Sequence, residues 1–562
     1  MRWTIKPNPD PEKVKHLSET LNVDSFIAQL LVQRGVNNFD EARQFFRPAL
    51  PDLHNPYLMK DMDKAVERIE KAIINNENIL VFGDYDVDGT TAVALVSSYL
   101  KTISPNIATY IPDRYDEGYG ISFKGIDFAD DNAFSLIIAL DCGIKSIAHV
   151  DYANEKKIDF IICDHHRPGD VLPNAVAILD PKRADCSYPY DELCGCGVGF
   201  KLIQALGQNR NQTTEDLVPY LDLVATAIGA DIVPITGENR VLAHFGLQVI
   251  NSDPRPGIKA LIHLIKKKTL DITDVVFIVA PRINAAGRIK HGNHAVELLT
   301  EFDFEQAQQF ASEIESYNSE RKDLDKQITI EALAQIEENQ EQNQFTTVVF
   351  NEKWHKGVIG IVASRLIETY YRPTLVFTKS GDKYAASARS VKGFDVYNAL
   401  EACSEYLEQF GGHMYAAGMT LQPENYQNFK NAFEKVVKAT IHPDMLVPEI
   451  AIDAEINFEA ITPKLTRILQ QFEPFGPQNM TPVFVTKQIK DTGYGKPIGQ
   501  NDEHLKLFVK HNNSEGIGAI GFGLGKKIDL TTHQKPFDAA YCIDENEFND
   551  KVSIQLRLKD IV

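Results

Sequence analysis

Apolar side chains follow helical spacing in some parts of the chain and strand spacing in others. Residues 1–75 carry apolar positions at helical intervals, which predicts an N-terminal helical region. Between residues 76 and 250, short apolar runs alternate with helical patterns, as in βαβ units with a parallel sheet. Residues 346–445 repeat this alternation and predict a second α/β domain. The fold class predicted from the pattern is therefore α/β, with two α/β lobes.

Two further segments show different patterns. Residues 251–345 form a basic and helical connector, in which apolar residues recur at roughly helical intervals between about residues 304 and 343. We expect one long, exposed helix there that joins the two lobes. Residues 446–562 contain short strands separated by turns, with clear alternation along Val552–Leu558. This length and pattern predict a C-terminal β-barrel of the OB type.

Polar side chains stand at the ends of four apolar runs in the first 235 residues. Three runs are interpreted as buried strands, and the fourth, Leu221–Ala230, as a buried helix. After the first run, alternation places three aspartates on one side of an extended segment, and a helix is expected to start after Gly89. The side chains that end the four runs are Asp84, Asp86, Asp88, Asp141, Asp164, His165, His166 and Asp231.

These side chains are suited to divalent cations. Loops at the carboxyl ends of parallel strands are where open α/β sheets bind ligands. Oxygen ligands alone favour Mg²⁺, and an added imidazole shifts the preference toward Mn²⁺. The alternative is that aspartates simply end strands and cap helices, which explains any single position equally well. Four such ends, together with two adjacent histidines, favour a metal site.

Composition and charge narrow the class of protein. The chain has 562 residues, enough for several domains, and its net charge of −20 counts against a surface-wide basic coat for nucleic acid. A local basic groove stays open, because positive charge gathers between Arg255 and Lys290 and includes Lys266–Lys268. A solvated helix face explains these three lysines equally well.

The sequence also bears on the compartment. No run is apolar enough to cross a membrane, and Met1–Pro7 lacks the apolar stretch of a signal peptide. The seven cysteines are sparse and odd in number, which counts against a disulfide framework. Cys194-Gly195-Cys196 is better explained as structural than as a metal site. We therefore expect a cytoplasmic protein without a membrane partner.

The order of the motifs resembles that of the DHH phosphoesterase superfamily. Asp84–Gly89, Asp141, Asp164-His165-His166 and Asp231 follow one another as its motifs do. Further segments are similar to those of its single-strand-specific 5′→3′ DNA exonucleases and extend the resemblance over nearly the whole chain: Arg114–Gly120, Pro281–Arg288, Gly411–His413 and Pro474–Asn479. By this resemblance the two lobes are a DHH domain and a DHH-associated domain.

The resemblance implies a metal-dependent exonuclease that degrades single-stranded DNA in the 5′→3′ direction to mononucleotides and acts in DNA recombination and repair. Phosphodiester hydrolysis needs an activated water and stabilisation of charge on the phosphate, and two divalent ions, Mn²⁺ or Mg²⁺, can supply both. The predicted metal ligands are Asp84, Asp86, Asp88, Asp141, His165 and Asp231.

Three residues have predicted catalytic roles around these ligands. Asp84 either binds a metal directly or supports the residues that do. Asp164 is expected to orient a histidine or a ligand loop. His166 is the candidate for contacting the scissile phosphate or for acting as the general acid, and a satisfied structural histidine is the alternative.

An exonuclease must also recognise the end of its substrate. A 5′ phosphate would be selected by arginine side chains and helix N-termini. Each candidate arginine could instead form an ordinary salt bridge, the candidate tyrosine could pack rather than stack on a base, and the candidate histidine could be an interdomain contact. The predicted substrate-binding residues are Arg114, Tyr119, Arg282, Ser387, Arg389 and His413.

Two other functions stay open at this point. A DHH phosphoesterase acting on short oligonucleotides, cyclic dinucleotides or inorganic polyphosphate would usually lack the barrel predicted at residues 446–562. A non-catalytic DNA-binding or replication-scaffold protein should have lost metal ligands, and none of the six is lost. From the resemblance we also expect a single-strand-binding protein and a RecQ-type helicase as partners, and a monomer.

Overall fold

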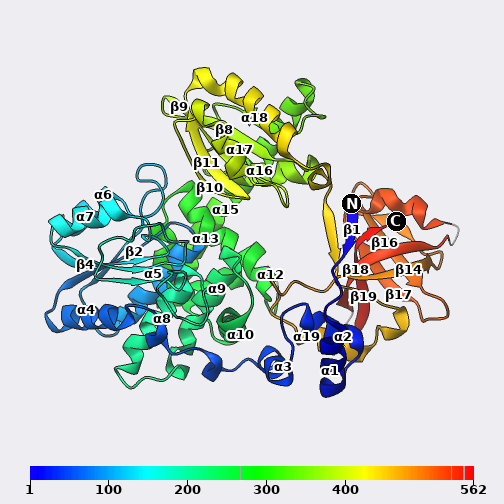
Figure 1. The fold of residues 1–562 in the computed structure, drawn as a ribbon, viewed down its shortest axis with the longest axis horizontal. Coiled ribbons are helices and arrows are strands. Elements are labelled where there is room, and N and C mark those ends of the chain that lie inside the picture. The colour runs from blue at the N-terminus through cyan, green and yellow to red at the C-terminus, as the bar shows by residue number, and fades with distance from the viewer. Residues whose placement is uncertain (266, 533–534, 549–550) are drawn as a thin grey trace. The chain divides into compact units, whose positions relative to one another are not determined.

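The computed structural model describes residues 1–265, 267–532, 535–548 and 551–562. The chain forms two compact units, and Figure 1 shows the elements of both. The smaller unit contains residues 313–449 with residues 1–2 and 288–290, and the larger unit contains the remainder. Helix α15, Phe304–Glu338, begins in the larger unit and ends in the smaller one, so the predicted linking helix is present.

A five-stranded parallel sheet lies at the centre of the larger unit, with strand order β3-β2-β4-β5-β6. Its strands are almost entirely apolar because helices cover them, and α6 and α7 share a hydrophobic core with β2, β4 and β5. The strands are β2 Asn78–Gly83, β3 Ile107–Tyr110, β4 Phe134–Leu140, β5 Asp159–Cys163 and β6 Ala177–Leu179.

Helices α5, α8 and α9 are buried along most of their length, which explains why their sequences lack a polar face. The helices that precede α15 are α1 Pro11–Leu21, α2 Ser25–Val32, α3 Phe39–Phe46, α4 Met62–Ile74, α5 Val87–Lys101, α6 Phe123–Asp131, α7 Ile147–Glu155, α8 Gly195–Gln208, α9 Leu221–Asp231, α10 Gly237–Ser252, α11 Pro256–His263, α12 Ile272–Asp274, α13 Ala280–Ile289 and α14 Asn293–Thr300.

The C-terminal strands of the larger unit close into a barrel. The sheet runs β13-β14-β18-β19-β17-β16-β15, and an additional β14–β16 pairing closes a ring of five strands, as in an OB fold. Helices α1 to α3 share one hydrophobic core with this barrel. The elements are β13 Ala454–Glu455, α19 Pro463–Gln470, β14 Phe484–Asp491, β15 Lys496–Ile498, β16 His504–Lys510, β17 Ile517–Gly521, β18 Phe537–Phe548 and β19 Lys551–Ile561.

The smaller unit is the second α/β domain, with a mixed sheet of order β10-β11-β9-β8-β7. Only the β7–β8 pair is parallel among its described pairings. Its elements are β7 Thr347–Phe350, α16 Ile359–Thr369, β8 Thr374–Ser380, β9 Lys383–Arg389, α17 Val396–Glu401, β10 Gln409–His413, β11 Ala416–Leu421 and α18 Tyr426–Thr440.

Two local predictions were wrong. The segment after β2 is not extended as far as Asp88, because the Asp86 carboxylate accepts a hydrogen bond from the Gly89 amide and caps α5, which already begins at Val87. The N-terminal region also contains a strand, β1 Arg2–Ile5, which pairs with β12 Glu449–Ile452. Local spacing gives no signal for a strand whose partner lies so far along the chain.

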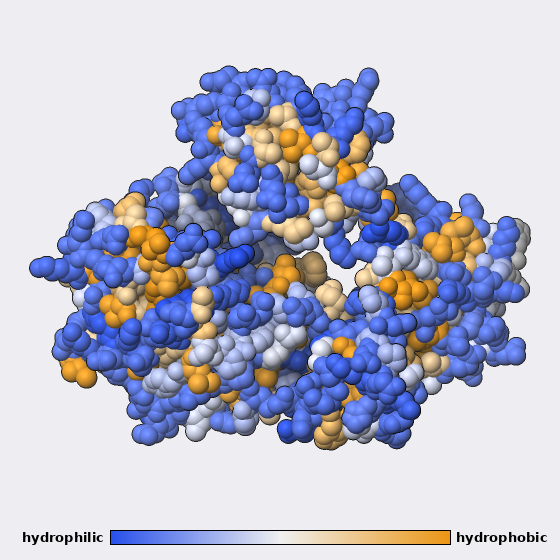
Figure 2. All heavy atoms as spheres, in the orientation of Figure 1, coloured by the Kyte–Doolittle hydropathy of each residue, from blue (hydrophilic) through white to orange (hydrophobic). Residues whose placement is uncertain are grey.

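The surface agrees with the acidic composition. On the face drawn in Figure 2 most residues are hydrophilic, and hydrophobic residues form scattered patches. In the basic segment, Arg255 forms a salt bridge within the protein, since its Nε lies 3.0 Å from Oδ1 of the buried Asp222. Lys266 lies outside the described residues. None of the described helices is long and apolar enough to span a membrane.

Candidate metal centre and phosphate site

The carboxyl ends of three parallel strands carry predicted site residues: two of them are predicted metal ligands, and Asp164 is the predicted orienting carboxylate. Asp84 directly follows β2, Asp141 follows β4, and Asp164 follows β5. Asp231 is the last residue of the buried helix α9, as the apolar pattern predicted. Asp141 has φ 58°, in the left-handed region that aspartate tolerates better than most residues, so the chain turns sharply where this carboxylate leaves the strand.

His165 lies at the centre of the cluster. Its Nε2 is 3.2 Å from Oδ1 of Asp141, 3.5 Å from Oδ2 of Asp231 and 3.7 Å from Oδ2 of Asp88. Two overlapping groups could each hold an ion: Asp88, His165 and Asp231, and Asp141, His165 and His166, with potential ligand atoms within 4.8 Å of one another in each group. The imidazole common to both groups is the one predicted to bind metal.

The N-terminus of α8 fixes Asp88. The amides of Gly195 and Cys196 donate hydrogen bonds of 2.6 and 2.7 Å to its two carboxylate oxygens. A Cβ atom on Gly195 would lie 2.5 Å from Cβ of Asp141, so only glycine permits this close approach. Cys194 and Cys196 are buried free thiols, which agrees with the structural interpretation of this segment.

The charges of the cluster fit divalent cations. Burial and the neighbouring carboxylates raise the pKa of Asp88 to about 6 and that of Asp231 to about 8. The same causes raise the pKa of Asp84 and Asp141 well above the usual range. Burial and His166 lower the pKa of His165 to about 3, which leaves this imidazole neutral. Burial and mutual repulsion therefore oppose the ionised forms of these carboxylates, and a bound cation would relieve that repulsion.

Unused ligand atoms support the same conclusion. Nε2 of His165, Oδ1 of Asp141 and Oδ2 of Asp84 are buried, and the described residues give them no hydrogen-bond partner. A buried polar atom without a partner is costly unless something else binds it. Oxygen and imidazole ligands together suit Mn²⁺ or Mg²⁺.

Asp164 and His166 form a pair beside the cluster. Oδ1 of Asp164 lies 2.7 Å from Nδ1 of His166, and Asp164 also accepts hydrogen bonds from the amides of Ile144, His165 and His166. Although burial opposes it, the His166 contact lowers the pKa of Asp164 to about 2. Burial also opposes the charge on His166, but Asp164 outweighs it and raises the histidine pKa to about 9. Nε2 of His166 remains on the open side, 3.2 Å from the Tyr119 hydroxyl.

Sequence reasoning missed one aspartate at the same edge. Asp180 directly follows β6, is fully buried, and has one carboxylate oxygen without a hydrogen-bond partner among the described residues. Burial raises its pKa to about 7. The signal was present, because the apolar run Ala175–Leu179 ends in this aspartate just as the other strands do.

Three predicted substrate residues lie in the larger unit. Tyr119 is 55% exposed while its hydroxyl contacts His166, so it is not simply a packing residue. The Arg114 guanidinium lies 3.9 Å from the ring centroid of Tyr85, within the loop that carries Asp84. Arg282 is half-buried on α13, and Nη1 donates a hydrogen bond to the Ile278 carbonyl.

The other three lie in the smaller unit. Nη1 of Arg389 is 3.1 Å from the Ser387 hydroxyl, and both side chains face Gly360 in the first turn of α16. We call Ser387, Arg389 and the start of α16 the phosphate cluster. Burial lowers the pKa of Arg389, and its hydrogen bonds within the described residues go to the Ser387 hydroxyl and the Ala388 carbonyl rather than to a carboxylate. His413 is exposed on β10, and strand register places it in the same row as Arg389, two strands away.

The fold and this carboxylate–histidine cluster define a phosphoesterase of the DHH type. Residues 78–228 match the DHH family, N-terminal domain, residues 342–439 match the DHHA1 domain, and residues 452–560 match the RecJ OB domain.

Curated relatives and solved structures narrow the class further. The single-stranded-DNA-specific exonuclease RecJ of Bacillus subtilis is 36% identical over all of this chain and 70% of its own length. Its Escherichia coli counterpart is 31% identical over 95% of each chain. The structure of RecJ in complex with Mn²⁺ from Thermus thermophilus aligns with a TM-score of 0.86 and 25% identity, covering all of this chain and 79% of that one.

The chain belongs to the RecJ family of single-stranded-DNA-specific exonucleases. The predicted superfamily and the predicted fold class, two α/β lobes joined by a long helix with an OB-type barrel, are therefore confirmed. The predicted class of enzyme, a single-stranded-DNA-specific exonuclease, is confirmed by the family to which the chain belongs. The Thermus thermophilus structures with Mn²⁺ and with Mg²⁺ agree with the predicted type of cofactor.

Proposed function

We propose that this protein degrades single-stranded DNA from the 5′ end to mononucleotides, with divalent metal ions, in DNA recombination and repair. The observation that carries the proposal is the convergence of three carboxylates on Nε2 of His165, all within 3.7 Å. Bound Mn²⁺ or Mg²⁺ would supply an activated water and neutralise charge on the phosphate. Asp86, Asp88, Asp141, His165 and Asp231 would hold the ions, with Asp84 as a ligand or as support for one.

His166 is the residue that we infer to face the scissile phosphate. Its Nδ1 is tied to Asp164 at 2.7 Å, which fixes the ring orientation and the position of its proton. Nε2 is then free to exchange the Tyr119 hydroxyl for a phosphate oxygen, or to give a proton to the leaving oxygen. Asp164 has no such opening, because backbone amides and His166 occupy both of its oxygens, and its role is to orient.

The phosphate cluster is suited to a terminal 5′ phosphate. The start of α16 has no side-chain cap, which leaves the amides of Ile359 and Gly360 available to an anion. Arg389 and Ser387 border the same turn. His413 lies in the same row of the sheet as Arg389, and we infer that it helps to orient the phosphate. Arg114 and Arg282, in the larger unit, stay predicted substrate-binding residues. A terminal phosphate carries more charge than an internal one, which makes such a cluster a sensor of the DNA end.

The barrel supports single-stranded DNA as the substrate, since OB folds hold single strands in grooves with stacking side chains. It also counts against the shorter phosphoesterases considered above. The complete set of metal ligands counts against a non-catalytic scaffold. Action in the cytoplasm as a monomer, beside a single-strand-binding protein and a RecQ-type helicase, stays a prediction.

The test is a digest of single-stranded DNA labelled at either end, with Mn²⁺, Mg²⁺ or EDTA. We expect immediate release of the 5′ label as a mononucleotide, gradual shortening of the 3′-labelled strand, and no cleavage in EDTA. Asp141→Asn should remove the activity, and Asp131→Asn, at the exposed end of α6, is the matched control that should retain it. First release of the 3′ label, or cleavage without metal, would contradict the proposal.

A further inference from the structure

The segment Pro474–Asn479, which the sequence singled out, lies outside the metal centre. It connects α19 to β14, and we call residues 471–480 the joint. Gly476 and Asn479 exchange backbone hydrogen bonds of 3.1 and 2.8 Å. The side-chain amide of the buried Asn479 donates to the carbonyls of Phe472 and Pro474 at 2.8 and 2.9 Å. The joint is therefore a closed, internally bonded turn.

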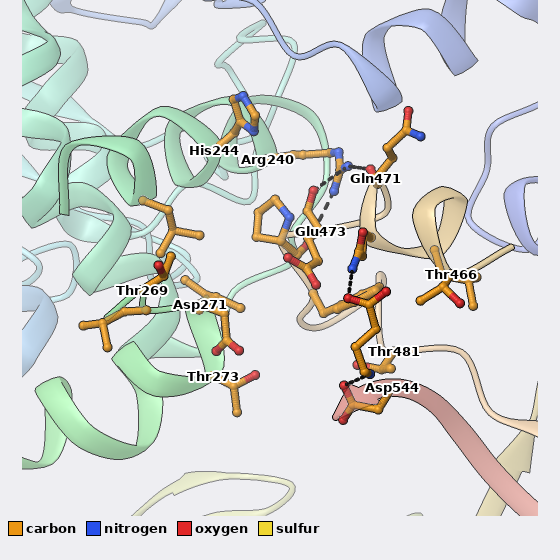
Figure 3. Close-up of a pocket in the computed structure, with 18 of the residues that line it drawn as sticks. Arg240, His244, Thr269, Asp271, Thr273, Thr466, Gln471, Glu473, Thr481 and Asp544 are labelled. Atoms are coloured by element: carbon orange, nitrogen blue, oxygen red, sulfur yellow. Dashed lines mark hydrogen bonds between the residues drawn. The ribbon is translucent and has the colours of Figure 1, made fainter. Parts of the chain in front are cut away.

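Two arginines from other parts of the larger unit hold the joint. The Arg240 guanidinium, from α10, donates to the carbonyls of Gln471, Phe472, Glu473 and Pro474, and Figure 3 shows it directed at this segment. Nε of Arg34, from the loop after α2, donates to Oδ1 of Asn479 at 2.9 Å. A cavity of about 670 Å³ borders the joint at Glu473–Phe475.

The joint contacts the chain just beyond Asp231. The amide of Ile235 donates a 2.9 Å hydrogen bond to the Pro477 carbonyl. Gly476 approaches the same residue so closely that an added Cβ would lie 2.4 Å from Cγ1 of Ile235. Ile235 is buried and follows Asp231 by four positions, with α10 starting at Gly237.

The intervening turn is strained. Ile232, which directly follows Asp231, has φ 60°, a conformation that β-branched residues rarely adopt. Such a residue persists only where its surroundings hold it. The Pro234 carbonyl is fixed by Nδ2 of Asn239 at 3.0 Å, and Ile235 is fixed by the joint. Because the turn is strained, contacts on its far side help to keep Oδ2 of Asp231 at 3.5 Å from Nε2 of His165.

We propose that the joint positions Asp231 for metal binding, with Gly476 and Ile235 as the positioning residues. The inference rests on the proposed function, in which Asp231 is a metal ligand. Displacing the joint by a few tenths of an ångström shifts Ile235 and, through the strained turn, the carboxylate. If the joint only attached the barrel, changes in it would alter stability or DNA binding and leave metal affinity untouched.

The test is calorimetric titration of the full-length, metal-free protein with Mn²⁺ alone, with thermal unfolding measured in parallel. Gly476→Ala should weaken Mn²⁺ binding about tenfold, the range typical of residues that orient metal ligands. Gly518→Ala is the matched control, since its Cβ would meet only the Gln555 side-chain nitrogen at 4.0 Å, and Mn²⁺ affinity should not change.

A second substitution separates positioning from damage. Ile235→Ala removes the Cγ1 atom that the new Cβ would strike but keeps the backbone bond to Pro477. The double variant Gly476→Ala/Ile235→Ala should therefore bind Mn²⁺ more tightly than Gly476→Ala alone. If the two substitutions acted independently, their effects on Mn²⁺ affinity would add, and a double variant that binds Mn²⁺ no better than the single one would overturn the proposal.

One further variant distinguishes failure of this inference from failure of the proposed function. Asp231→Asn should weaken Mn²⁺ binding at least as much as Gly476→Ala does. If Asp231→Asn leaves the affinity unchanged, the ligand assignment itself is wrong. If Asp231→Asn weakens binding while folded Gly476→Ala binds Mn²⁺ like the wild type, the ligand stands and the positioning role is overturned.

Discussion

The metal centre and the phosphate cluster both bury ionisable side chains, but the metal centre buries acids and the phosphate cluster buries a base. In the metal centre, Asp84, Asp141 and Asp231 are acids whose pKa is raised, because burial and mutual repulsion oppose their charge. In the phosphate cluster, Arg389 is a base whose pKa is lowered by burial, with a hydroxyl rather than a carboxylate beside it. The acids of the metal centre indicate a cation as the ligand, and the arginine of the phosphate cluster indicates an anion.

The two sites also differ in how the chain builds them. The metal centre uses the ends of parallel strands and of a buried helix, where turns aim several side chains at one point. The phosphate cluster uses the end of an antiparallel strand and the start of a helix, and part of its charge comes from backbone amides. We therefore expect substitutions in the first to affect catalysis on every substrate, and substitutions in the second to affect only the choice of DNA end.

The largest effect is expected from His165→Ala, which removes the imidazole common to both groups of ligands. Turnover of single-stranded DNA should fall by at least about 10³-fold, beyond the 10–100-fold typical of groups that only support a ligand. Initial rates with saturating Mn²⁺ measure this loss. His16→Ala, on the exposed surface of α1, should remain fully active, and comparable rates in the two variants would remove His165 from the metal centre.

A smaller loss is expected from Asp164→Asn, because this residue acts through His166. Without the carboxylate, the positive charge and the orientation of the His166 ring are no longer held, and kcat should fall about 10–100-fold. Mn²⁺ affinity, measured by titration, should change little. A loss of Mn²⁺ affinity matching that of Asp231→Asn would instead make Asp164 a ligand.

Arg389→Met tests the second site. It should weaken binding of a 5′-phosphorylated oligonucleotide by about 10–100-fold, the equivalent of about 1.5–3 kcal/mol for hydrogen bonds to a charged group. Binding of the same oligonucleotide with a 5′ hydroxyl should be unaffected. Arg365→Met is the matched control on the exposed side of α16. Equal losses on both oligonucleotides would show that Arg389 does not sense the DNA end.

The smallest effect is expected from Tyr119→Phe, which keeps the ring and removes the hydroxyl 3.2 Å from His166. Cleavage should change by no more than about two- to tenfold, the value of one hydrogen bond of about 0.5–1.5 kcal/mol, because the phosphate replaces this hydroxyl as the partner of His166. Tyr119→Ala should cost more if a base stacks on the ring, since stacking contributes about 1–3 kcal/mol. Equal rates for the two variants would mean that the ring itself does not contact DNA.

Short apolar runs predicted where the buried strands and the buried helix end. Asp84, Asp141 and Asp164 were found because each follows a short apolar run, and Asp231 because its helix is apolar all round. The same rule applied more strictly would have found Asp180 after β6. Asp88 was found, but its position in α5 was not, since whether Asp86 caps a helix or continues a strand depends on contacts that alternation does not reveal.

Contacts between segments that are far apart in the sequence could not be predicted from the spacing of apolar residues. The backbone amides of Gly195 and Cys196 that hold Asp88 come from a segment notable in the sequence only for its cysteines. Strand β1 needs β12 as a partner, and the joint becomes visible as a support for Asp231 only when Pro477 and Ile235 are placed side by side. The role of Ser387 and Arg389 in binding a terminal phosphate stays a prediction.

We propose that the buried carboxylates and His165 hold two divalent ions. The most direct measurement is the number of Mn²⁺ ions bound per chain, by electron paramagnetic resonance or calorimetry, for the metal-free wild type and for Asp88→Asn. We predict two ions in the wild type and the loss or marked weakening of at least one in the variant. No specific Mn²⁺ binding by the wild type, or identical binding by Asp88→Asn, would contradict the claim.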